Sequence, residues 1–177
     1  DNQTEQTILN HVKQNFSLAA DEVSIKKIEA ENLPNGVAQY YVEKKSSYGN
    51  IFYNYLIYNN QLYCSGVEKD FGKFLQDTNF LAAKNLTTAQ FLQLYRVLSF
   101  KRRDINILSA EKISNPSDKI KLYAKQLAPP QLTFEDGGAT LIFFGKKVAA
   151  EKVERFEIKV SPAYQVIVSN QVLEKTA

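Results

Sequence analysis

The sequence has few of the residues on which metal, nucleophile and disulfide chemistry depend. Its 177 residues include one cysteine and one histidine, with no methionine and no tryptophan. A single cysteine excludes an intrachain disulfide, and with one histidine it is too few for an ordinary structural zinc site. The sequence also lacks a Gly-x-Ser-x-Gly motif, an Asp-rich calcium loop and a glycine-rich phosphate loop. We therefore predict no catalytic residue, no metal ligand and no cofactor-binding residue.

Long apolar runs and an excess of one charge are also missing. No apolar run approaches the roughly 18 residues of a membrane span, so no membrane span is predicted. Lys and Arg number 22 and Asp and Glu 19, a net charge of +3, which is too small to indicate a nucleic-acid-binding protein. Lys101, Arg102 and Arg103 end a predicted helix, where cations complement the helix dipole. We do not expect nucleic acid as a partner.

Cys64 and His11 both have ordinary structural interpretations. Cys64 lies among apolar strand residues and is expected to be a small core residue. His11 lies beside the apolar stripe of the first predicted helix and is expected to be partly exposed. A Cys64–His11 nucleophile pair is arithmetically conceivable, but nothing in the sequence places the two side chains together. We predict that the protein is not an enzyme.

The chain begins with Asp1 and contains no methionine. We interpret this as loss of the natural start, and removal of a signal peptide would make the protein an exported one. The polar composition, rich in asparagine and tyrosine, also favours export. We therefore expect an extracytoplasmic location, whether secreted, periplasmic or attached to the envelope.

The spacing of apolar residues predicts an α+β fold with antiparallel sheets. Helical spacing predicts helices over residues 3–16, from Val67, over about 88–100 and over about 116–127. Ser65 with Glu68 and Thr87 with Gln90 form the capping boxes predicted to start the second and third helices. Alternating or β-branched runs predict strands at Val23–Ala30, Val37–Lys45, Ile51–Tyr58, Gln61–Cys64, Asp104–Leu108, Gln131–Glu135, Ala139–Phe144, Val153–Val160 and Tyr164–Leu173.

The order of these elements predicts two similar units. A helix and four strands occupy the start of the chain, the same order recurs from about residue 116, and two helices lie between them. We place the division at residues 1–83 and 84–177. Each unit resembles the helix-across-a-meander layout of cystatin-like and PepSY-like modules, a likeness of fold that implies no function. The alternative is one curved sheet wrapped on several helices, as in NTF2-like folds.

The hairpin at residues 51–64 is the strongest indication of function. Its sequence, IFYNYLIYNNQLYC, contains four tyrosines and a phenylalanine and no lysine or arginine. Period-two alternation leaves neither face polar, so a second layer, a ligand or another protein must cover each face. One explanation of the aromatic residues is structural: the other unit or the helices cover the hairpin. The other explanation is functional: the hairpin is an interaction surface, since tyrosine is enriched in protein interfaces. The predicted partner-binding residues are Tyr40, Tyr48, Phe52, Tyr53, Tyr55, Tyr58 and Tyr63.

We therefore predict a non-catalytic, exported binding or assembly module that uses an aromatic sheet face. Its partner would be another protein or a second copy of the chain. The alternative is a small-ligand-binding protein or enzyme in which a curved sheet encloses an apolar pocket for a small apolar ligand.

Overall fold

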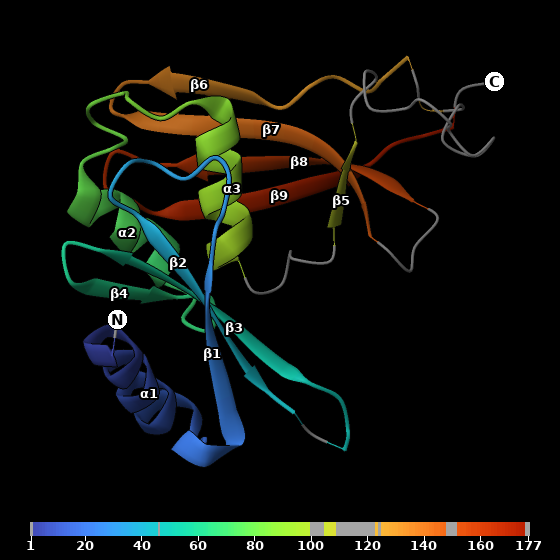
Figure 1. Ribbon diagram of the computed structural model, residues 1–177. Helices are drawn as coiled ribbons and strands as arrows, with labels where there is room; N and C mark the ends of the chain where they lie inside the picture. Colours follow the sequence, from blue (N-terminus) through green and yellow to red (C-terminus); the bar gives the residue numbers. More distant parts are fainter. Residues whose placement is uncertain are drawn as a thin grey trace.

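The fold is α+β with two antiparallel sheets, as the sequence predicts (Figure 1). The computed structural model describes residues 2–45, 47–99, 105–108, 123, 125–147 and 152–175. The helices are α1 (Asn2–Phe16), α2 (Asp70–Thr78) and α3 (Thr88–Leu98), and a short 3-10 turn, η1 (Ala20–Glu22), precedes the first strand. The strands are β1 (Val23–Ile28), β2 (Ala38–Lys44), β3 (Ile51–Tyr58), β4 (Gln61–Cys64), β5 (Ile105–Leu108), β6 (Gln131–Glu135), β7 (Gly138–Lys147), β8 (Val153–Val160) and β9 (Val166–Val172).

The first sheet is an antiparallel meander in the order β1-β2-β3-β4. β3 and β4 have the bounds that alternation predicts, and Asn59 and Asn60 form the turn between them. Both asparagines have positive φ, 47° and 61°, which a tight hairpin turn requires and asparagine tolerates. Tyr58 pairs with Gln61 beside this turn, so the turn fixes the register of the aromatic strand.

The second sheet has five strands. Its main order is β5-β7-β8-β9, and β6 also pairs with β7. β6 pairs with the start of β7, Leu132 facing Leu141, whereas β5 pairs with its end, Ile107 facing Gly145. The predicted strand at residues 104–108 is therefore confirmed and becomes a fifth strand beside the predicted C-terminal meander. Among the described residues β9 pairs with β8 alone and forms an edge of this sheet.

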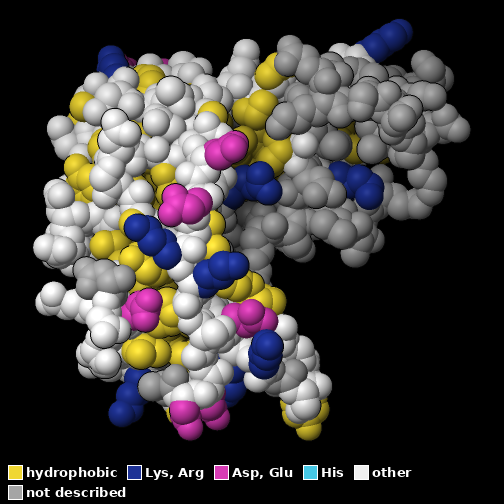
Figure 2. Space-filling model, in the orientation of Figure 1, with side chains coloured by type: hydrophobic (Ala, Val, Ile, Leu, Met, Phe, Trp, Pro, Cys, Tyr) yellow, Lys and Arg dark blue, Asp and Glu magenta, His cyan; other side chains and the backbone are white. Residues whose placement is uncertain are grey.

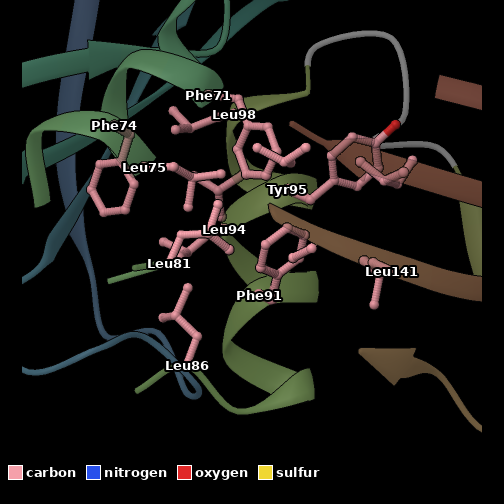
Figure 3. Close-up of a cluster of buried hydrophobic side chains, with 14 of the residues drawn as sticks. Phe71, Phe74, Leu75, Leu81, Leu86, Phe91, Leu94, Tyr95, Leu98 and Leu141 are labelled. Carbon is pink, nitrogen blue, oxygen red and sulfur yellow. The ribbon is translucent and has the colours of Figure 1, made fainter. Parts of the chain in front are cut away.

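α2 and α3 contribute to a hydrophobic core that includes residues of both sheets (Figure 3). α3 crosses the second sheet in Figure 1 and also contacts β3 of the first sheet. The ring of Phe71 on α2 meets Phe91 and Tyr95 of α3 edge-on, at 5.7 and 5.6 Å between centroids. The cluster crosses the predicted division at residue 83. Its buried members include Leu56, Tyr63, Phe74, Leu75, Leu81, Leu86, Leu94, Leu98, Leu141, Phe143, Phe156, Ile158 and Val160.

The start of α2 corrects one prediction. The capping box of Ser65 and Glu68 predicts a helix from Val67, but the helix begins at Asp70. The hydroxyl of Ser65 instead accepts the backbone N–H of Asn54 at 2.9 Å, a tertiary contact that occupies the capping group. The carboxylate of Asp70 accepts the backbone N–H of Cys64 at 2.8 Å and ties the helix start to the end of β4.

The start of α3 agrees with its prediction. The Thr87 hydroxyl accepts the backbone N–H of Gln90 at 3.1 Å, and the Gln90 side chain accepts the Thr87 N–H at 2.9 Å. The predicted helix over about residues 116–127 falls largely outside the described residues. Tyr123 and Leu127 of this stretch are buried, and they pack with Phe144 and Val153 of the second sheet.

Candidate interaction surface

α1 covers one face of the tyrosine-rich hairpin (Figure 1). The strand register places Tyr40 opposite Tyr55 and puts Tyr53 on the same face. Tyr40 and Tyr55 are 5% and 0% exposed. The Tyr53 ring stacks on Phe16 of α1, with centroids 4.0 Å apart and planes 11° apart. These three predicted partner-binding residues therefore belong to a packed layer between the helix and the sheet.

The helix reaches this face through the apolar stripe that its sequence predicts. Ile8 and Val12 are buried, and Phe16 is partly buried at its end. The stripe of α1 packs within the chain, in one cluster with β2, β3 and β4. The cluster also contains Leu18, Tyr40, Val42, Tyr55 and Cys64. Among the described residues no helix is long and apolar enough to cross a membrane.

α2 covers part of the opposite face of the hairpin. Tyr63 is fully buried, and its ring meets Phe74 edge-on at 5.0 Å between centroids. Its hydroxyl donates to Asp77 Oδ2 at 2.9 Å, and the Lys73 ammonium lies 5.3 Å from its ring centroid. Burial and the Asp77 carboxylate raise the pKa of Tyr63 above its ordinary value. Tyr63 therefore anchors α2 to β4.

The remaining predicted residues lie toward the rim and tip of the sheet. Tyr58 is half-buried and meets Phe80 edge-on at 5.3 Å between centroids. Phe52 is half-buried and stacks on Tyr41, with centroids 5.3 Å apart and planes 27° apart. Tyr48 is fully exposed in the loop between β2 and β3, at the end of the first sheet that projects from the lower part of the molecule (Figure 1 and Figure 2). The seven predicted residues therefore do not form one continuous surface.

A polar cluster lies in the apolar layer beneath α1. The Tyr55 hydroxyl is 2.8 Å from His11 Nδ1, and Tyr55 lies directly opposite Cys64 in the strand register. The pKa of Tyr55 is raised by burial and by its neighbours, so the hydroxyl keeps its proton. The tautomer of His11 sets which of the two groups donates in this hydrogen bond. The structure thus brings both His11 and Cys64 next to Tyr55, a proximity that the sequence did not predict.

The electrostatics of this cluster do not activate a nucleophile. Burial raises the pKa of the Cys64 thiol to about 11, so the thiol stays protonated at neutral pH, and the thiolate is the reactive form. Burial lowers the pKa of His11, and the nearby Asp70 carboxylate opposes this shift. Burial in turn raises the pKa of Asp70, opposed by the N–H of Cys64 and by His11. The contact between His11 and the Tyr55 hydroxyl connects α1 to the sheet.

β9 is an exposed edge strand that the seven predicted residues do not include. Its last six residues are all exposed, on both faces of the strand. Ile167, Val168 and Val172 are 64%, 38% and 47% exposed, which is unusual for β-branched residues in a sheet. α2 reaches only the beginning of this strand, where Gly72 lies so close to the Tyr164 carbonyl that an added Cβ would approach it to 2.6 Å.

The hydrogen-bond pattern shows which backbone groups of β9 face outward. Leu173 donates to Val153 and Ser161 donates to Gln165, so odd-numbered residues of this strand bond to β8. In an antiparallel ladder the intervening residues direct their N–H and C=O groups away from that neighbour. The outward residues are Val166, Val168, Asn170 and Val172. An added strand could pair with this row of groups, as in β-augmentation.

A concave feature lies beside the candidate edge strand. One open hollow of about 270 Å³ lies on the outer face of the second sheet, beside the start of β9. Its lining includes Glu135, Thr140, Lys159, Pro162 and Ile167. Within the described ranges no group of His, Cys, Asp and Glu side chains is arranged to hold a metal ion.

Comparison of the chain with protein-family models, with curated proteins and with solved structures finds no match. The cystatin-like and NTF2-like layouts therefore remain predictions about the fold.

Proposed function

We propose that this chain is a non-catalytic protein-binding or assembly module whose binding surface is the edge strand β9. The observation that carries this proposal is a seven-residue strand, Val166–Val172, that has no charged residue and, within the described part of the chain, is paired on one side only. Edge strands of stable monomers are usually short, charged or covered, because an open row of backbone groups invites pairing with another chain. β9 has none of these protections over its last six residues.

The burial of the tyrosines supports β9 over the aromatic hairpin as the binding surface. Tyr40, Tyr55 and Tyr63 are packed under α1 and α2, so a partner could reach them only after a helix moved away. The loop between β2 and β3 and the start of β3 expose Tyr48 and Ile51, fewer large apolar side chains than β9 exposes. The buried tyrosines serve mainly in packing: their rings lie in the core, and the hydroxyls of Tyr55 and Tyr63 form hydrogen bonds.

Two observations support a role in binding rather than catalysis or ligand transport. The only thiol is buried and protonated beside a neutral histidine. The hollow on the second sheet is open and includes the charged side chains of Glu135 and Lys159, whereas a small apolar ligand would need an enclosed apolar pocket.

Peptide selection with a matched counter-selection tests this proposal. A phage-displayed library of random extended peptides is selected on the wild-type protein and on Val168→Pro. Proline at this position removes an outward N–H and leaves the bonds to β8 in place, a position where edge strands tolerate proline. We expect peptides that bind the wild type and lose at least tenfold in affinity for the variant.

Circular dichroism spectra of the two proteins check that Val168→Pro keeps the fold. If every selected peptide bound both folded proteins equally, β9 would not be the binding surface and the proposal would be wrong.

A further inference from the structure

The edge strands β1 and β9 of the two sheets differ in the charge that they expose. β1, an edge of the first sheet, exposes Lys26 and Lys27, and lysines on an edge oppose pairing with another copy of the same strand. β9 has the sequence VIVSNQV and exposes no charge of its own. A second copy of β9 would therefore meet no like charge from the strand itself.

The outward backbone groups of β9 fit a second copy of the strand in one symmetric register. If a two-fold axis passes beside Ser169, Val166 faces Val172 of the second copy and Val168 faces its Asn170. All four outward residues then form hydrogen-bonded pairs with the second copy. Each of the four pairs has two N–H···O=C bonds, which gives about eight backbone hydrogen bonds. An isologous contact of this kind closes on itself and produces a dimer rather than a filament.

The side chains agree with this register. On the outer face of the sheet Ile167 would face Gln171 of the second copy, and Ser169 would face its own counterpart. The exposed surface of Ile167 would be partly covered by this pairing. On the other face, the outward valines would meet a valine and an asparagine, all uncharged.

The charges of one β8 strand would lie far from those of the other. Arg155, Glu157 and Lys159 are on the same outer face and are paired with one another, Arg155 to Glu157 at 3.1 Å and Lys159 to Glu157 at 3.2 Å. In the joined sheet the two β8 strands would be three strand spacings apart, roughly 14 Å. This exceeds the Debye length of about 8 Å at physiological ionic strength. On the inner face, the buried carboxylate of Glu154 accepts a hydrogen bond from the Asn170 side chain at 2.6 Å within the same chain.

We propose that the protein forms a two-fold dimer in which β9 pairs with β9 of a second copy, centred on Ser169, so that the two second sheets become one continuous sheet. The inference rests on the proposed function, because it names a second copy of this chain as the partner of the edge strand.

The molecular mass in solution of two Ser169 variants with opposite charges tests the dimer. This side chain is exposed, so Ser169→Lys and Ser169→Glu should keep the fold. Size-exclusion chromatography with light scattering should give the wild type a mass of twice the 20.1 kDa chain. Each variant alone should be monomeric, because like charges would meet at the axis. An equimolar mixture of the two should return to the dimer mass, because the opposite charges then face each other.

Thr133→Lys is the matched control, since Thr133 is also exposed on a strand of the same sheet but lies on β6. It should leave the dimer unchanged. A wild type that is monomeric at every accessible concentration would overturn the inference, and so would a dimer that persists in both Ser169 variants.

The peptide selection separates this failure from failure of the proposed function. A monomeric wild type whose selected peptides require Val168 would retain β9 as a binding edge and assign it to a different protein. A monomer without such peptides would remove both proposals.

Discussion

Replacement of Tyr55 by serine should separate a packed aromatic face from an open one. The Tyr55 side chain is fully buried, and its hydroxyl lies 2.8 Å from His11 Nδ1. Loss of a buried aromatic ring costs about 3–5 kcal/mol of unfolding free energy, through lost burial and the cavity left behind. The shorter serine also cannot reach His11, and an unpaired buried polar group adds about 1–3 kcal/mol. The expected loss is therefore about 4–8 kcal/mol, a large part of the total stability of an ordinary domain.

Urea unfolding followed by far-ultraviolet circular dichroism measures this loss. Tyr55→Phe keeps the ring and removes the hydroxyl, so it should lose only the hydrogen-bond part, about 1–3 kcal/mol. Tyr48→Ser is the control, because Tyr48 is fully exposed and surface changes usually stay within about 0.5 kcal/mol. Equal and small losses for Tyr55→Ser and Tyr48→Ser would refute the reasoning that α1 seals this face.

Three further predictions follow from buried polar groups. Tyr95 is 2% exposed and its hydroxyl has no hydrogen-bond partner in the described structure, so Tyr95→Phe should raise the unfolding free energy by about 1 kcal/mol in urea titrations; a clear loss would show that the hydroxyl has a partner. Burial lowers the pKa of His11 below 6.5, so as the pH falls the unfolded chain binds a proton at this histidine before the folded chain does. The contribution of His11 to the free energy of unfolding is therefore complete above pH 6.5 and is lost as the pH falls. Urea midpoints between roughly pH 7.5 and pH 5.5 should therefore fall less steeply in His11→Gln than in the wild type, and parallel curves would contradict this role. Cys64, buried and with a pKa of about 11, should react with a thiol reagent far more slowly in the native protein than in urea, and similar rates would place the thiol at the surface.

The sequence predicts local structure well where local rules decide it. β3, β4 and β8 have the predicted bounds, because alternation and the Asn59–Asn60 turn depend only on neighbouring residues. The start of α2 was predicted wrongly because Ser65 can cap a helix or bond to another strand, and tertiary packing chose Asn54. Such a choice depends on residues distant in the sequence.

The candidate site was harder to predict for the same reason. Period two assigns Tyr53 and Tyr55 to one face but cannot say that α1 will cover it. The meeting of His11 with Cys64 depends on how α1 docks. β9 was predicted as a strand, but its position at an edge depends on the order of strands in space, and a run of valine and isoleucine ordinarily indicates a buried strand. Only the structure shows that one side of this strand is open.

The first sheet separates two hydrophobic clusters that share no buried residue. One lies under α1, and the other joins α2 and α3 to both sheets. Native-state hydrogen exchange should therefore divide the molecule into two cooperative units, with the amides of α1 exchanging through a partial opening that leaves the larger cluster intact. Such an opening would transiently expose Tyr40, Tyr53 and Tyr55 without global unfolding. The burial of these tyrosines therefore depends on the free energy of detaching one helix and not on the stability of the whole fold.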